Sequence, residues 1–70
     1  MIEIDELEKI VLSLIWEGKT SDEISQHIFR SKKTVDLIRT HLMQKFEVAN
    51  VIDLVRKSIL MGYYFRRNNP

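Results

Sequence analysis

Hydroxyl and basic side chains gather in one short stretch of the chain. Ser31 and Thr34 flank Lys32 and Lys33, where a capping residue before an amphipathic pattern predicts the start of a helix. A helix N-terminus is electropositive and presents free backbone N–H groups, so these side chains are well placed to hold phosphate. Arg39 would add a further phosphate contact. The stretch therefore favours a phosphate-bearing partner.

Two further side chains of the same predicted helix suit contact with DNA bases. Leu37 and Thr40 are expected on its exposed surface. Leu37 offers apolar contact to a thymine methyl group, and the Thr40 hydroxyl offers a hydrogen bond to a base edge. Phosphate and base contacts would then come from a single helix.

Catalytic chemistry is not favoured by the arrangement of the reactive residues. The serines have no general base grouped around them, and the chain has no cysteine. His27 and His41 lack further ligands at metal-binding spacing. We therefore expect no catalytic residue, no metal and no cofactor, and we interpret the protein as a non-enzyme.

Two helices are predicted in the N-terminal half of the chain. The first covers about residues 6–17, where Asp5 and Glu8 form a capping-box-like start. The second covers about residues 21–28 and begins at the pair Thr20 and Glu23. The apolar positions expected on the buried face of the first helix are Leu7, Ile10, Val11, Leu14 and Ile15.

Two more helices are predicted in the C-terminal half. The third covers about residues 32–46 and is the longest basic amphipathic segment, and the fourth covers about residues 51–61 after a cap at Asn50. No hairpin signal accompanies them, so the sequence predicts one all-α domain over residues 1–70. The apolar positions that follow the cap of the fourth helix are Ile52, Val55, Ile59 and Leu60.

The charge is distributed unevenly along the chain. Residues 1–25 hold seven acidic and two basic residues, a net −5, whereas residues 26–70 hold nine basic and three acidic residues, a net +6. A basic C-terminal part favours a polyanion, although a merely solvated surface is the alternative. No signal peptide or apolar run of ~20 residues is present, so we expect a cytoplasmic protein without a membrane contact.

The order of the elements is that of a helix-turn-helix. A short helix is followed by a tight turn at 29–31 and then by the longer basic helix. In this arrangement the second helix of the motif enters the major groove while the first lies across the DNA backbone.

Four stretches of the chain resemble the LuxR-type helix-turn-helix family, the output domain of many response regulators and quorum-sensing regulators. They are residues 8–20, Glu23 with Ile24, residues 31–35 with the spacing S-x-x-T-V, and residues 45–50. The resemblance implies four helices without a wing, a third helix that reads the major groove and a fourth that pairs with a second copy. The residues expected to contact DNA are Thr20, Ser31, Lys32, Lys33, Thr34, Asp36, Leu37, Arg39 and Thr40.

Several positions depart from the family pattern. Asp22 and Asp36 stand where basic residues are common, and Ile38 replaces a frequent histidine. Asp36 would accept a hydrogen bond from cytosine N4 or pair with a lysine one turn earlier. Arg30 replaces an apolar residue, and Glu47 stands where glycine usually forms a left-handed cap, at a cost on the order of 1 kcal/mol.

The fourth helix carries more apolar residues than one buried face requires. We expect the surplus to form a two-fold contact that places two recognition helices about one DNA turn apart. The alternative is that these side chains cover the core or meet the aromatic residues 63–65. The residues predicted at the dimer contact are Val51, Leu54, Val55 and Ser58.

The sequence thus predicts a dimeric, sequence-specific DNA-binding protein that regulates transcription. These 70 residues would be either a complete regulator or the output domain of a longer protein, whose receiver or sensor domain would then be a further partner. The alternative is a protein-interaction module that keeps the fold while Asp22 and Asp36 weaken DNA binding. Salt dependence separates the two, because phosphate contacts lose affinity steeply as salt rises.

Overall fold

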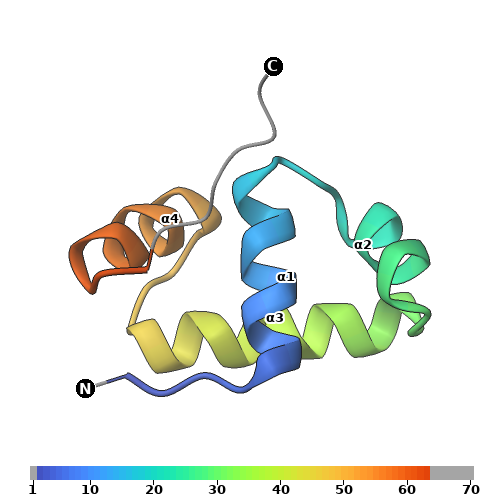
Figure 1. Ribbon diagram of the computed structural model, residues 1–70, viewed down its shortest axis with the longest axis horizontal. Coiled ribbons are helices and arrows are strands. Elements are labelled where there is room, and N and C mark those ends of the chain that lie inside the picture. The colour runs from blue at the N-terminus through green and yellow to red at the C-terminus, as the bar shows by residue number, and fades with distance from the viewer. Residues whose placement is uncertain (1, 64–70) are drawn as a thin grey trace.

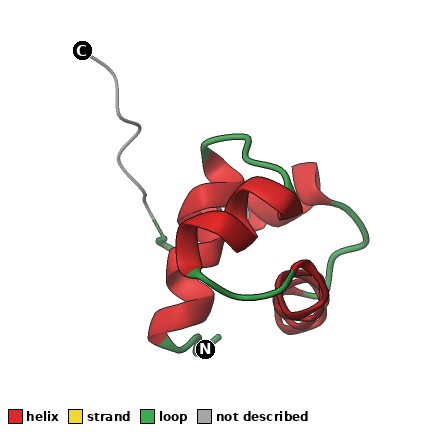
Figure 2. Cartoon of the chain, turned by 90° about the vertical axis from the view of Figure 1, so that its right-hand side faces the viewer, coloured by secondary structure: helices red, strands yellow, loops and turns green. Residues whose placement is uncertain are grey.

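Four helices joined by short loops make up the fold. The computed structural model describes residues 2–63, with α1 at Glu6–Trp16, α2 at Ser21–Ile28, α3 at Lys32–Phe46 and α4 at Val51–Leu60. Figure 2 shows that this part of the chain holds helices and loops but no strand. The predicted all-α, four-helix class is confirmed, and α1 and α4 each end one residue earlier than expected.

Side-chain caps explain where the first two helices begin. The Glu8 N–H donates to Asp5 Oδ1 at 2.7 Å, and the Asp5 N–H donates to Glu8 Oε1 at 2.9 Å. Thr20 and Glu23 form the same reciprocal pair at the start of α2. Each pair satisfies backbone donors that the start of a helix leaves without intrahelical partners.

Left-handed residues end two of the helices. Phe29 follows α2 with φ 57°, and Glu47 follows α3 with φ 55°. The left-handed conformation at Glu47 is the one predicted there from the family pattern, in a position that usually holds glycine. Because a side chain crowds the backbone in this region, both residues carry a local strain that glycine would not.

The long helix α3 is the base on which the other three helices pack. Figure 1 shows α1 crossing α3, with α2 and α4 at opposite ends of it. Every helix contributes to one core, which is mostly drawn from α1 and α3. The fully buried or nearly buried apolar side chains are Val11, Leu12, Leu14, Ile15, Ile24, Val35, Ile38, Leu42, Phe46 and Leu54.

The buried face of α4 differs from the prediction. Ile52 is 70% exposed and Leu60 is 83% exposed, whereas Leu54 and Ser58 are fully buried. The core therefore meets the face of α4 that contains Leu54 and Ser58, and two of the apolar positions expected from the sequence, Ile52 and Leu60, lie outside it. The predicted dimer residues Leu54 and Ser58 need correction, because neither has surface left for a second copy.

A hydrogen bond between α1 and α4 explains why a serine is buried. The Trp16 Nε1–H donates to Ser58 Oγ at 3.1 Å, and the Ser58 hydroxyl donates to the Val55 carbonyl at 2.7 Å. A buried hydroxyl costs free energy unless it is hydrogen-bonded, and here its donor and an acceptor lone pair are both used. Trp16 thereby joins the end of α1 to α4.

One carboxylate of α1 is also buried, that of the capping residue Glu8. Glu8 is 6% exposed, and its Oε1 lies 2.7 Å from Lys45 Nζ on α3. Lys45 also donates to the Glu3 carbonyl, and the Tyr63 hydroxyl donates to the Ile2 carbonyl at 2.7 Å. These contacts tie the segment before α1 to the C-terminal half of the chain.

On the buried face of α1 the prediction was right for three of its positions. Val11, Leu14 and Ile15 are buried as expected, but Ile10 is 40% exposed and Leu12 is fully buried instead. Because α1 packs against both α3 and α4, more than one side of this helix is covered, which explains why Leu12 is buried as well.

Candidate nucleic-acid interface

The helix-turn-helix consists of α2, the turn at residues 29–31 and α3. The Arg30 N–H donates to the Ser25 carbonyl at 3.1 Å, which closes the end of α2. Ser31 then caps α3 in an extended conformation, and its Oγ accepts from the Thr34 N–H at 3.1 Å. Ile24 and Val35 anchor the two helices in the core, each with no exposed surface. The orientation of α3 is therefore set by packing.

The start of α3 presents the predicted anion-binding groups to solvent. Lys32 and Lys33 are both exposed in the first turn. The Ser31 hydroxyl donates to Thr34 Oγ1 at 3.0 Å, so the proton of the Thr34 hydroxyl remains available to a ligand. The first backbone N–H groups of the helix lie at the same place. The chemistry of this end suits phosphate oxygens.

From the first turn of α3 onward, five of the predicted residues line a single open hollow of about 400 Å³. Leu37 is 55% exposed although it is apolar. The Thr40 hydroxyl donates to the Asp36 carbonyl at 3.0 Å. The residues lining the hollow are Lys33, Thr34, Asp36, Leu37 and Thr40.

The remaining predicted residues lie outside this hollow. Ser31 contacts its edge through Thr34. Arg39 is half-buried next to the exposed Thr40. Thr20 is exposed at the start of α2, where its hydroxyl accepts from the Glu23 N–H at 3.2 Å. A contact from Thr20 to DNA remains a prediction.

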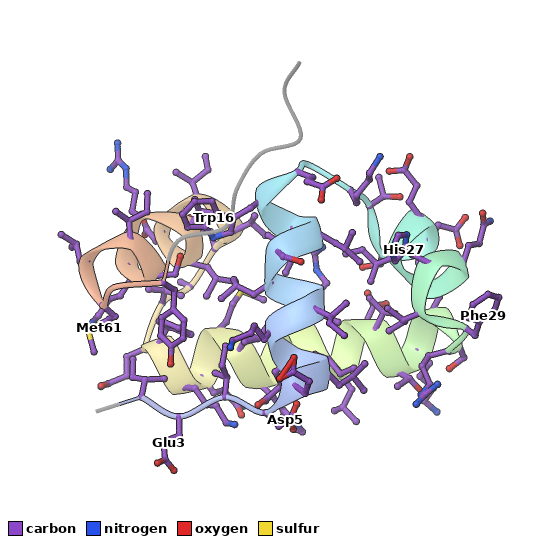
Figure 3. All side chains as sticks on the ribbon, in the orientation of Figure 1. Glu3, Asp5, Trp16, His27, Phe29 and Met61 are labelled. Carbon is purple, nitrogen blue, oxygen red and sulfur yellow. The ribbon has the colours of Figure 1, made fainter. Side chains whose placement is uncertain are left out.

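Phe29 is a surface residue that the sequence analysis did not single out. Its side chain is 89% exposed and points away from the body of the molecule at the turn between α2 and α3 (Figure 3). It lies after the last residue of α2, so no helical periodicity applied to it. An exposed aromatic side chain on a residue in the left-handed conformation contributes little to the stability of the fold.

The exposed apolar surface of α4 lies elsewhere on the molecule. Figure 3 shows Met61, at the end of α4, on the opposite side of the molecule from Phe29. Val51 and Val55, two of the predicted dimer residues, are half-buried. The exposed apolar side chains at this helix are Ile52, Ile59, Leu60 and Met61.

Other kinds of site find little support in residues 2–63. This part of the chain holds no group of three or more histidine, cysteine or acidic residues that would bind a metal ion. His27 and His41 are both exposed. No helix within the same residues is long and apolar enough to cross a membrane.

The fold and the exposed basic start of α3 define a four-helix helix-turn-helix protein. Residues 6–58 match the family described as bacterial regulatory proteins, luxR family, and the chain belongs to that family. This membership indicates DNA binding and transcription regulation, and the family is one of regulators rather than enzymes.

A relative from Escherichia coli strain K12 supports the same assignment. The chain is 38% identical over 55 residues to a protein named uncharacterized response regulatory protein YgeK. The match covers 79% of this chain but only 37% of that relative. No solved structure gave a significant match.

Proposed function

We propose that the protein binds specific sequences of double-stranded DNA through α3 and thereby regulates transcription. The observation that carries the proposal is the exposed face of α3. Basic and hydroxyl groups at the start of this helix lie next to a hollow whose polar and apolar side chains could contact base edges. Lys32, Lys33, Ser31 and Thr34 would hold phosphates, and residues further along would meet base edges. The site of action would be the bacterial cytoplasm, where the DNA lies.

The proposal includes a dimer that forms through the exposed part of α4. Ile52 and Leu60 are large apolar side chains that the fold leaves in solvent, and Val51 and Val55 lie half-buried beside them. Burying such residues against a second copy is favourable, and a two-fold pair would present two α3 helices to DNA. The longer response-regulator relative supports a further proposal, that a receiver domain governs this pairing.

The alternative of a protein-interaction module is supported by two acidic residues. Asp22 and Asp36 are both exposed on the two helices of the motif, where a carboxylate close to phosphate is repulsive. Such a module would show little affinity for duplex DNA even in dilute buffer.

A matched pair of lysine variants tests the main proposal. Lys33→Ala removes a charge from the start of α3, and Lys9→Ala removes the same charge from the exposed surface of α1. Fluorescence anisotropy with random duplex DNA from about 50 to 200 mM salt should show steeply falling affinity. Lys33→Ala should reduce the salt slope by about one, and Lys9→Ala should not. Absence of binding at low salt would favour the interaction module.

A further inference from the structure

The side of α3 that lines the hollow carries mostly hydrogen-bond acceptors and apolar groups. Four residues that line the hollow follow one another at helical spacing and form a stripe along α3: Lys33, Asp36, Leu37 and Thr40. From Lys33 to Thr40 the helix rises by roughly 10 Å, which matches about three base-pair steps. One short run of bases would therefore face all four side chains.

Beyond Lys33, this stripe offers acceptors and apolar surface but no spare donor. The Asp36 carboxylate can only accept when it is ionised. The Thr40 hydroxyl uses its proton on the Asp36 carbonyl at 3.0 Å, so toward solvent it presents lone pairs and a methyl group. Leu37 adds apolar surface that is 55% exposed.

The Asp36 carboxylate is not used within the fold. Among residues 2–63 the salt bridge joins Glu8 and Lys45, and none joins Asp36 to the lysines one turn earlier. Its side chain also takes part in no hydrogen bond there, since the Thr40 hydroxyl contacts the Asp36 backbone. Asp36 is exposed, so its acceptor oxygens face solvent and are free to meet a ligand.

We propose that Asp36 is a specificity-determining residue that selects cytosine, and that Leu37 beside it favours an adjacent thymine. In the major groove cytosine presents a single polar group, the N4 amino donor, whereas guanine and thymine present only acceptors and adenine places its N6 donor beside an N7 acceptor. A carboxylate, which can only accept, is repelled by each of these acceptors and therefore fits cytosine best. This inference rests on the proposed function and adds which bases α3 reads.

Selection from a random duplex library tests the assignment with the unaltered chain and two variants. Asp36→Asn keeps the shape but adds donors, and an amide pairs with the N6 and N7 of adenine. Glu47→Gln changes the net charge equally at the far end of α3, outside the stripe. Circular dichroism and thermal melting establish that each variant is folded.

The unaltered chain and Glu47→Gln should select the same site with one required cytosine, and replacing that cytosine by thymine should weaken binding at least about fivefold. Asp36→Asn should change the preferred base at that one position to adenine. If both proteins bind DNA but Asp36→Asn keeps the same preferred cytosine, the role of Asp36 is overturned while DNA binding stands. If the unaltered chain binds no duplex at low salt, both the proposed function and this inference fail.

Discussion

At the scale of single residues, Phe29 stands out because its conformation and its exposure both work against stability. It adopts φ 57° with 89% of its surface exposed. We predict that Phe29→Gly raises the free energy of unfolding by about 0.5–1 kcal/mol, since glycine adopts this conformation without strain. Urea denaturation measures the change, and Phe29→Ala, which keeps a Cβ, is the control. A loss of stability in the glycine variant would contradict this account.

The ion pair between Glu8 and Lys45 is a second residue-scale feature with a measurable effect. The hydrogen bond to Glu8 raises the pKa of Lys45 above its ordinary value, and neighbouring carboxylates add to the rise. Because this pKa is raised in the folded state, the contribution to stability is fully present below about pH 10.4 and is lost as pH rises through the folded value.

We predict that Glu8→Gln returns the Lys45 pKa toward the ordinary value. Side-chain NMR of Lys45 at increasing pH measures it, and Lys9, an exposed lysine on α1, provides the comparison within the same protein. If Lys45 titrates at the same pH with and without the Glu8 carboxylate, the ion pair does not persist in solution.

Among the helices, α4 is the one whose buried face could not be predicted from the spacing of its apolar residues. The helix has apolar residues on most of its circumference, so its sequence pattern does not select one face. Burial of Ser58 costs little because Trp16, 42 residues earlier, donates a hydrogen bond to it, and no local pattern in the sequence reports such a partner. By contrast, α3 was predicted to be amphipathic, and its inward-facing residues Val35 and Leu42 are fully buried.

Some features of the candidate DNA-binding residues follow from the local sequence, and others do not. The start of α3 followed from a local cap and neighbouring lysines, and Ser31 indeed caps the helix. The hydrogen bond from the Thr40 hydroxyl to the Asp36 carbonyl could not be predicted from the sequence. A threonine hydroxyl in a helix can donate either to water or to a backbone carbonyl one turn earlier, and the residue type does not decide between the two.

The corrected face of α4 leads to a prediction with a built-in control. Leu54→Ala should lower the free energy of unfolding by about 2–5 kcal/mol, because it leaves a cavity at a fully buried site. At protein concentrations low enough to keep the chain monomeric, Ile52→Ala on the same helix should change it by no more than about 0.5 kcal/mol, since that side chain is 70% exposed. Thermal or urea unfolding compares the two. Equal effects would show that α4 packs by another face.

At the scale of the whole molecule, the exposed end of α4 is expected to govern self-association. Leu60 is 83% exposed, so Leu60→Asp should leave the fold intact while it weakens a dimer at least about fivefold. Analytical ultracentrifugation in the absence of DNA measures the effect. Leu37→Asp, which alters an exposed leucine on α3, is the control and should leave self-association unchanged. A monomer at all concentrations, with and without DNA, would remove the proposed dimer.

The surface that we propose to contact DNA is α3. The most direct test is a titration of the 15N-labelled protein with a duplex at low salt, followed by NMR chemical shifts of the backbone amides. We predict that the largest changes fall on residues 31–40, with small changes on α1, and that they reverse as salt is added. Changes confined to α1 or α4, or none at all, would contradict the claim.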